Sequence, residues 1–113
     1  MCTKLILNEI TDKIVWEIKN NLGDKLDKII LFGSYARGDF DDESDIDIMA
    51  LADISVTDAN KIDILLTRYA NHLGLEYDVV ISLFVKDCKT FYKFLPADPF
   101  YKNVMKDGVM INA

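Results

Sequence analysis

Two aspartates separated by one residue, Asp45 and Asp47, are the side chains of this sequence most able to do chemistry. Side chains two apart on a β-strand share a face, so both carboxylates are expected to point the same way, about 7 Å apart along the chain. Two partly buried carboxylates repel each other unless a cation neutralises them. A hard divalent cation with oxygen ligands, Mg²⁺ first, is the natural solution.

A third carboxylate is expected from an apolar run further along the chain, which contains Asp78. If a strand over residues 75–83 pairs with the strand that begins at Asp45, Asp78 completes a three-carboxylate site. Glu76 lies on the same face of that predicted strand and is an alternative third ligand. Asp78 is preferred because it lies one step deeper in the apolar run.

A glycine-containing turn supplies the other half of the expected site. Gly33 would let a phosphate approach the backbone closely, Ser34 offers a hydroxyl, and the N–H groups that follow could donate to phosphate oxygens. Arg37 either contacts a phosphate or braces the loop by pairing with an acid such as Asp39. One Mg²⁺ would then bind the triphosphate of a nucleotide. A second, held by the three carboxylates, would activate an acceptor hydroxyl, and Asp78 could take its proton.

The elements that must position these residues follow from hydrophobic periodicity. Thr11 is expected to cap a first helix that Gly23 ends, and Thr57 a second helix that Gly74 ends. The predicted helices are 11–22 and 58–73, with a turn or single helical turn at 34–38 and one or two short helices in 86–106, broken around Pro96 and Pro99. The predicted strands are 28–32, 45–51, 75–83 and 109–111. This order predicts an α/β (α+β) fold, a small mixed sheet covered by helices, in one domain over residues 1–113.

Composition excludes several classes of function. The chain has 113 residues and a net charge of −6, so it should not attract nucleic acid by electrostatics alone. No apolar run approaches the length of a membrane span, and the N-terminus lacks the apolar core of a signal peptide. Cys2 and Cys88 form neither a metal-ligand spacing nor a disulfide framework, which favours a reducing cytoplasm. The aromatic residues of the last third are expected to be core, or else a partner-binding face.

The residues Gly33-Ser34, ten intervening residues and then Asp45-x-Asp47 resemble the signature of the DNA polymerase beta nucleotidyltransferase superfamily. The fuller string Gly-Ser-Tyr-Ala-Arg-Gly with Ser44-Asp45-Ile46-Asp47 is similar to its minimal nucleotidyltransferase (MNT) branch. The segment 99–109 also resembles the C-terminal part of that family. The resemblance implies the polymerase-beta-type nucleotidyltransferase fold and Mg²⁺-dependent transfer of a nucleoside monophosphate from a triphosphate, with release of pyrophosphate.

Family resemblance also implies ATP as the substrate and a partner with a helical HEPN domain, because MNT proteins act as antitoxins that add AMP to a tyrosine of a HEPN toxin. Two alternatives stay open at this stage. One is a binding module that neutralises a helical partner by contact alone. The other is a small-molecule nucleotidyltransferase whose acceptor site is completed by a dimer or another subunit. The acceptor, the preferred base and the oligomeric state do not follow from the residues.

Overall fold

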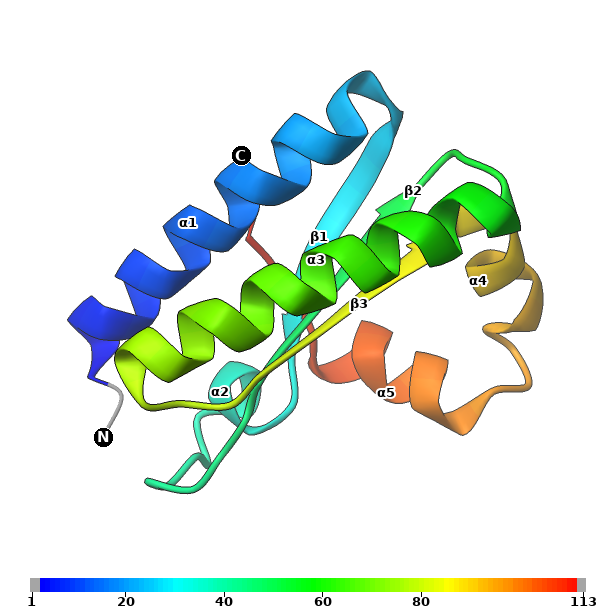
Figure 1. Ribbon diagram of the computed structural model, residues 1–113. Coiled ribbons are helices and arrows are strands. Elements are labelled where there is room, and N and C mark those ends of the chain that lie inside the picture. The colour runs from blue at the N-terminus through cyan, green and yellow to red at the C-terminus, as the bar shows by residue number, and fades with distance from the viewer. Residues whose placement is uncertain (1–2, 112–113) are drawn as a thin grey trace.

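A computed structural model describes residues 3–111 and places a four-stranded sheet between two layers of helices (Figure 1). The helices are α1 (Lys4–Leu22), α2 (Ser34–Arg37), α3 (Val56–Tyr77), α4 (Cys88–Phe94) and α5 (Pro99–Asp107), with a 3₁₀ turn at Gly23–Lys25. The strands are β1 (Leu26–Phe32), β2 (Ile46–Ala52), β3 (Ile81–Asp87) and β4 (Val109–Met110). The predicted fold class, a small mixed sheet covered by helices, is confirmed.

Strand order in the sheet is β3-β2-β1-β4. The strand β1 is antiparallel to both of its neighbours, whereas β2 and β3 are parallel and joined by α3. A parallel pair needs such a crossover connection, and the helix supplies it. The central strand β2 is buried on both faces over Ile48–Ala52, which explains why its second half is wholly apolar.

The two faces of the sheet carry separate cores. Ile46 and Ile48 of β2 pack with α1 and α3, whereas Met49 and Leu51 pack with Phe91 and Val104 of the C-terminal helices. Because side chains alternate along a strand, Asp47 lies on the same face as Met49, which is the face that α4 and α5 cover.

Both long helices begin earlier than the sequence predicts. Thr3 caps α1 by accepting a hydrogen bond from Ile6 N at 3.2 Å, so the helix starts before Thr11, whose hydroxyl donates to Asn8 O within the helix. Ser55, rather than Thr57, caps α3, with Asp58 N donating to its hydroxyl at 3.1 Å. Each helix therefore has a side-chain cap of the expected kind at a different position.

Gly74 does not end the second long helix, and this correction matters for the site. The helix α3 continues to Tyr77, and a Cβ on Gly74 would run into the backbone oxygen of Val79. The glycine is there for close packing against the chain that returns toward β3. The predicted strand 75–83 is consequently wrong, and the strand begins at Ile81.

The remaining elements match expectation more closely. Strand 28–32 lies within β1, the turn at 34–38 is a single helical turn, and the C-terminal region forms two helices, the second of which starts at Pro99. Pro99 suits the first turn because its missing N–H has no partner there in any helix. Between residues 3 and 111, no helix combines the length and apolar character that crossing a membrane requires. Cys88 is a free thiol, and Cys2 lies outside the described residues.

Candidate active site

The turn between β1 and α2 lies directly against the carboxylate of Asp47. Gly33 has φ 76° and ψ −157°, a backbone conformation that residues with a Cβ rarely adopt. A Cβ at this position would also fall well inside van der Waals distance of Asp47 Oδ2. Both the backbone angle and the close approach therefore require glycine. The predicted phosphate turn and the predicted metal ligand are thus brought together.

Hydrogen bonds stabilise the single turn α2, and an aromatic contact joins it to the acidic loop that follows. Ala36 N and Arg37 N both donate to Gly33 O at 3.1 Å, and Tyr35 stacks on Phe40 with ring centroids 4.4 Å apart. These contacts fix where the backbone of the turn lies relative to the loop that leads to β2.

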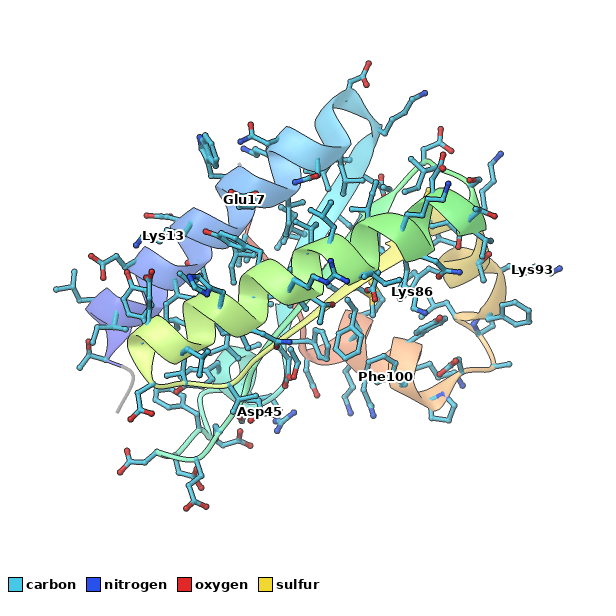
Figure 2. All side chains as sticks on the ribbon, viewed as in Figure 1. Lys13, Glu17, Asp45, Lys86, Lys93 and Phe100 are labelled. Carbon is cyan, nitrogen blue, oxygen red and sulfur yellow. The ribbon has the colours of Figure 1, made fainter. Side chains whose placement is uncertain are left out.

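Ser44 closes that loop just before the paired aspartates. Asp41 N donates to Ser44 Oγ at 2.9 Å, and the hydroxyl in turn lies 3.3 Å from Asp41 Oδ1. Ser44 therefore fixes the turn that leads into the strand. The next residue, Asp45, is exposed, and Figure 2 labels it where the chain enters β2.

Burial differs between the two aspartates of the motif. Asp45 is exposed and Asp47 is half buried. Burial, and then the nearby charge of Asp45, raise the pKa of the Asp47 carboxyl above its ordinary value, while Arg37 acts in the opposite direction. The carboxylate pair is therefore electrostatically strained, and a cation would relieve that strain. One exposed and one half-buried carboxylate fit Mg²⁺, which usually takes one or two carboxylates and completes its shell with phosphate and water oxygens.

Asp78 does not lie on a strand beside this pair, contrary to the prediction. It is the C-cap of α3, with φ 55° and ψ 47°, and its N–H donates to Gly74 O. Its side chain borders a hollow of about 300 Å³ together with Asp42 and Glu43 of the acidic loop. Asp residues tolerate the left-handed conformation better than most, so capping gives Asp78 a structural reason to be there.

Glu76, the alternative third ligand, is also displaced from the pair. It lies in the last turn of α3 and borders a hollow of about 490 Å³ between α1 and α3, with Trp16 and Tyr69. That hollow contains neither Asp45 nor Asp47 and opens on the other face of the sheet. Its size therefore does not mark it as the catalytic site.

Ser82 occupies the position on β3 that a third carboxylate was expected to fill. It pairs in register with Asp47, and Asp47 pairs on its other side with Phe32 of β1. Partners across strands present their side chains on the same face. Within residues 3–111, no three His, Cys, Asp or Glu side chains gather closely enough to hold a metal ion. The candidate site therefore has two carboxylates, Asp45 just before β2 and Asp47 on it.

Arg37 joins the predicted phosphate turn to the C-terminal helix, a connection that the sequence did not indicate. Its Nε donates to Asp39 Oδ2 at 3.1 Å, and its Nη1 lies 3.5 Å from Asp107 Oδ2 at the end of α5. The bracing role is thereby confirmed, and the hydrogen bond to Asp39 raises the pKa of Arg37. Asp107 could not have been found from spacing, because seventy residues separate the two partners.

This fold, with a glycine-serine turn against paired aspartates, is that of a nucleotidyltransferase, and comparison with known families agrees. A model described as "Nucleotidyltransferase domain" matches residues 12–111, so the chain belongs to that family. The chain is therefore a nucleotidyltransferase by family. That residues 1–113 form one domain stays a prediction.

Two proteins of Methanocaldococcus jannaschii, both named as protein adenylyltransferases, are similar in sequence. One is 42% identical over 86 residues, covering 74% of this chain and 85% of the relative. The other is 40% identical over 91 residues, covering 80% and 83%. The similarity spans most of both proteins in each case.

Solved structures with a similar fold come from toxin–antitoxin complexes. A crystal structure of the toxin–antitoxin MntA–HpeT has 27% identity and a TM-score of 0.58, covering 91% of this chain and 72% of that chain. A crystal structure of a toxin–antitoxin with AMP-PNP has 25% identity and a TM-score of 0.55, covering 88% and 70%. These neighbours have the fold in common with this chain.

Proposed function

We propose that this chain transfers AMP from ATP to a hydroxyl of a protein partner of the HEPN type, and thereby acts as an antitoxin. The observation that carries the proposal is the close approach of Gly33 to the Asp47 carboxylate, which supports a phosphate-binding turn beside a metal-binding pair. The names of the relatives, protein adenylyltransferases, support AMP transfer to protein. A toxin–antitoxin neighbour that contains AMP-PNP supports an adenine nucleotide.

Asp45 and Asp47 would hold Mg²⁺, whose charge would neutralise the triphosphate and the pyrophosphate that leaves. Gly33 lets the phosphates approach the backbone, and the Ser34 hydroxyl and the first N–H groups of α2 donate to their oxygens. Arg37, held by Asp39 and Asp107, adds a positive charge on the same side. The hydroxyl of the acceptor attacks the α-phosphorus, and pyrophosphate departs.

The number of metal ions follows from the carboxylates that β2 and β3 present. Asp45 and Asp47 suffice for one Mg²⁺ that shares its shell with phosphate oxygens. A second ion would depend on Asp78, which caps α3 and does not lie on β3. We therefore propose a site with one firmly held ion, and we assign no proton acceptor to β3.

Transfer of label from ATP tests this function. Wild type, Asp45→Asn and Asp47→Asn are each incubated with Mg²⁺, α-labelled ATP and the product of the neighbouring gene, the proposed HEPN-type partner. Wild type should label the partner, and each variant should be slower by on the order of 100-fold or more, because metal stabilisation is worth several kcal/mol. Equal labelling by all three proteins would contradict the proposal.

The serine at position 82, where a carboxylate was expected, favours a second candidate function. In this alternative the chain is a binding module that neutralises its partner by contact alone. A site without a carboxylate on β3 has fewer groups for catalysis than the three-carboxylate arrangement first expected. In that case Asp47→Asn should neutralise the partner as well as wild type does, measured as recovery of growth. Loss of neutralisation with binding retained would exclude contact alone.

A further inference from the structure

Three phenylalanine rings from separate elements meet on the face of the sheet that carries Asp47. Phe32 of β1, Phe84 of β3 and Phe100 of α5 lie with ring centroids 5.7–6.1 Å apart in all three pairs. Figure 2 labels Phe100 on α5, on the side of α3 where Asp45 also lies and away from Lys13 and Glu17 of α1. We call these three residues the phenylalanine cluster.

The phenylalanine cluster begins where the phosphate turn begins. Phe32 directly precedes Gly33 and pairs in register with Asp47. Phe84 follows two residues after Ser82, the other partner of Asp47, and so shares its face of the sheet. The cluster is therefore the apolar surface that adjoins the predicted phosphate and metal site.

The helix that carries the third ring is tied to the same turn. Arg37 of α2 reaches Asp107 at the end of α5, with Nη1 and Oδ2 3.5 Å apart. At the start of α5, Asp98 Oδ1 accepts hydrogen bonds from Phe100 N and Tyr101 N. The end of the helix is therefore tied to the turn, and the Asp98 cap fixes the backbone of its first turn, which carries Phe100.

Phe100 is more exposed to solvent than the two rings that it packs against. Phe32 is 7% exposed and serves the core, whereas Phe100 is 42% exposed. The plane of the Phe100 ring is tilted by 76° from that of Phe32 and by 66° from that of Phe84, so neither ring stacks flat on Phe100. The cluster thus supports an aromatic ring that keeps open surface toward solvent, which is the arrangement that a stacking ligand requires.

We propose that Phe100, supported by Phe32 and Phe84, is the stacking surface for the base of the nucleoside triphosphate. This inference rests on the proposed function, because it needs the phosphates at Gly33 and Ser34. Aromatic stacking uses the π-face that every base has and reads no hydrogen-bond pattern, so the larger purines should bind best and adenine and guanine should bind alike. The ligand class is a purine nucleoside triphosphate.

Binding measurements with and without a base separate this subsite from the phosphate site. Mg²⁺ complexes of ATP and of inorganic tripolyphosphate are titrated into wild type, Phe100→Ala and Phe100→Leu by calorimetry. Phe100→Ala should weaken ATP binding by on the order of tenfold and leave tripolyphosphate unchanged. Phe100→Leu keeps apolar volume for folding but has no π-face, so it should give the same pattern, and it decides the question if Phe100→Ala does not fold.

Phe94 provides the matched control, because it is 49% exposed at the end of α4 and the Lys93 ammonium lies over its ring, 5.5 Å from the ring centroid. Phe94→Ala should bind both ligands as wild type does. Unchanged ATP binding in the Phe100 variants, or equal weakening of ATP and tripolyphosphate, would overturn the stacking proposal alone. Failure of wild type to bind either ligand would instead overturn the proposed function.

Discussion

Gly33 and Asp47 lie so close together that the space between them admits no side chain. Gly33→Ala should therefore displace the Asp47 carboxylate in addition to straining the backbone. We expect a loss of about 1–3 kcal/mol in the free energy of unfolding, and a drop in transfer rate on the order of 100-fold, as expected for a misplaced catalytic group. Denaturant unfolding and the label-transfer assay measure the two effects.

Gly38 is the control for this substitution, because it too has a positive φ, of 85°, but a Cβ there would meet nothing within 4 Å. Gly38→Ala should cost about 1–2 kcal/mol of stability, with little loss of transfer in the remaining folded protein. Full activity in Gly33→Ala would show that the contact with Asp47 is not part of the site.

Asp47 also predicts how stability depends on pH when no metal is bound. Its pKa is raised in the folded protein, chiefly by burial and then by Asp45. The native state therefore favours the protonated carboxyl, so this group's contribution to stability is present at low pH and is lost as pH rises through the raised pKa. In EDTA, Asp47→Asn should have the higher Tm at neutral pH, and the difference should shrink in acid.

Mg²⁺ provides the internal check on that result, because a bound cation removes the repulsion that destabilises ionised Asp47. Added Mg²⁺ should raise the Tm of wild type and have little effect on Asp47→Asn. If the Tm difference between wild type and Asp47→Asn were the same in acid and at neutral pH, the assigned pKa direction would be wrong.

At the scale of elements, the position of β3 decides which carboxylates can join the site. Asp78 caps α3, so Asp78→Asn should keep transfer within about twofold of wild type, since Asn also tolerates the left-handed conformation. In contrast, Ser82→Asp should place a third carboxylate beside Asp47 and lower the half-saturating Mg²⁺ concentration by on the order of tenfold. Initial rates across a Mg²⁺ titration measure the transfer rate of Asp78→Asn and the Mg²⁺ requirement of Ser82→Asp.

Ser82→Asn is the neutral control and should leave the Mg²⁺ requirement unchanged, because it adds similar volume without charge. If Asp78→Asn abolished transfer while Ser82→Asp had no effect on the metal requirement, the assignment of the site to Asp45 and Asp47 alone would be wrong.

The same segment explains how far the sequence could predict this protein. Strand β2 and its aspartates were predictable, because alternating Asp and Ile followed by an apolar run is a local signal of a buried strand with one polar edge. The start of β3 was not, because Gly74 has the residue type of a helix stop but serves close packing against Val79 O. That distinction depends on a tertiary contact, which one sequence does not reveal.

Charge is the feature of the whole molecule that bears on its partner. The net charge is −6, and four of the acidic residues lie in the loop that leads to Asp45: Asp39, Asp41, Asp42 and Glu43. A partner that presents its acceptor hydroxyl among basic residues would be attracted to this end of the molecule. The helices α1 and α3 cover the opposite face of the sheet from Asp47, so in the proposed reaction the acceptor would approach from the side of the loop and α5 (Figure 1).

Pyrophosphate release from ATP tests the central claim, that Asp45 and Asp47 with the Gly33-Ser34 turn form a metal-dependent transferase site. The release rate is measured for wild type and Asp47→Asn with the HEPN-type partner present, in Mg²⁺ and in EDTA. Wild type in Mg²⁺ should release pyrophosphate in step with labelling of the partner, EDTA should abolish the release, and Asp47→Asn should slow it by on the order of 100-fold or more. Release that persists in EDTA, or in Asp47→Asn at the wild-type rate, would contradict the account.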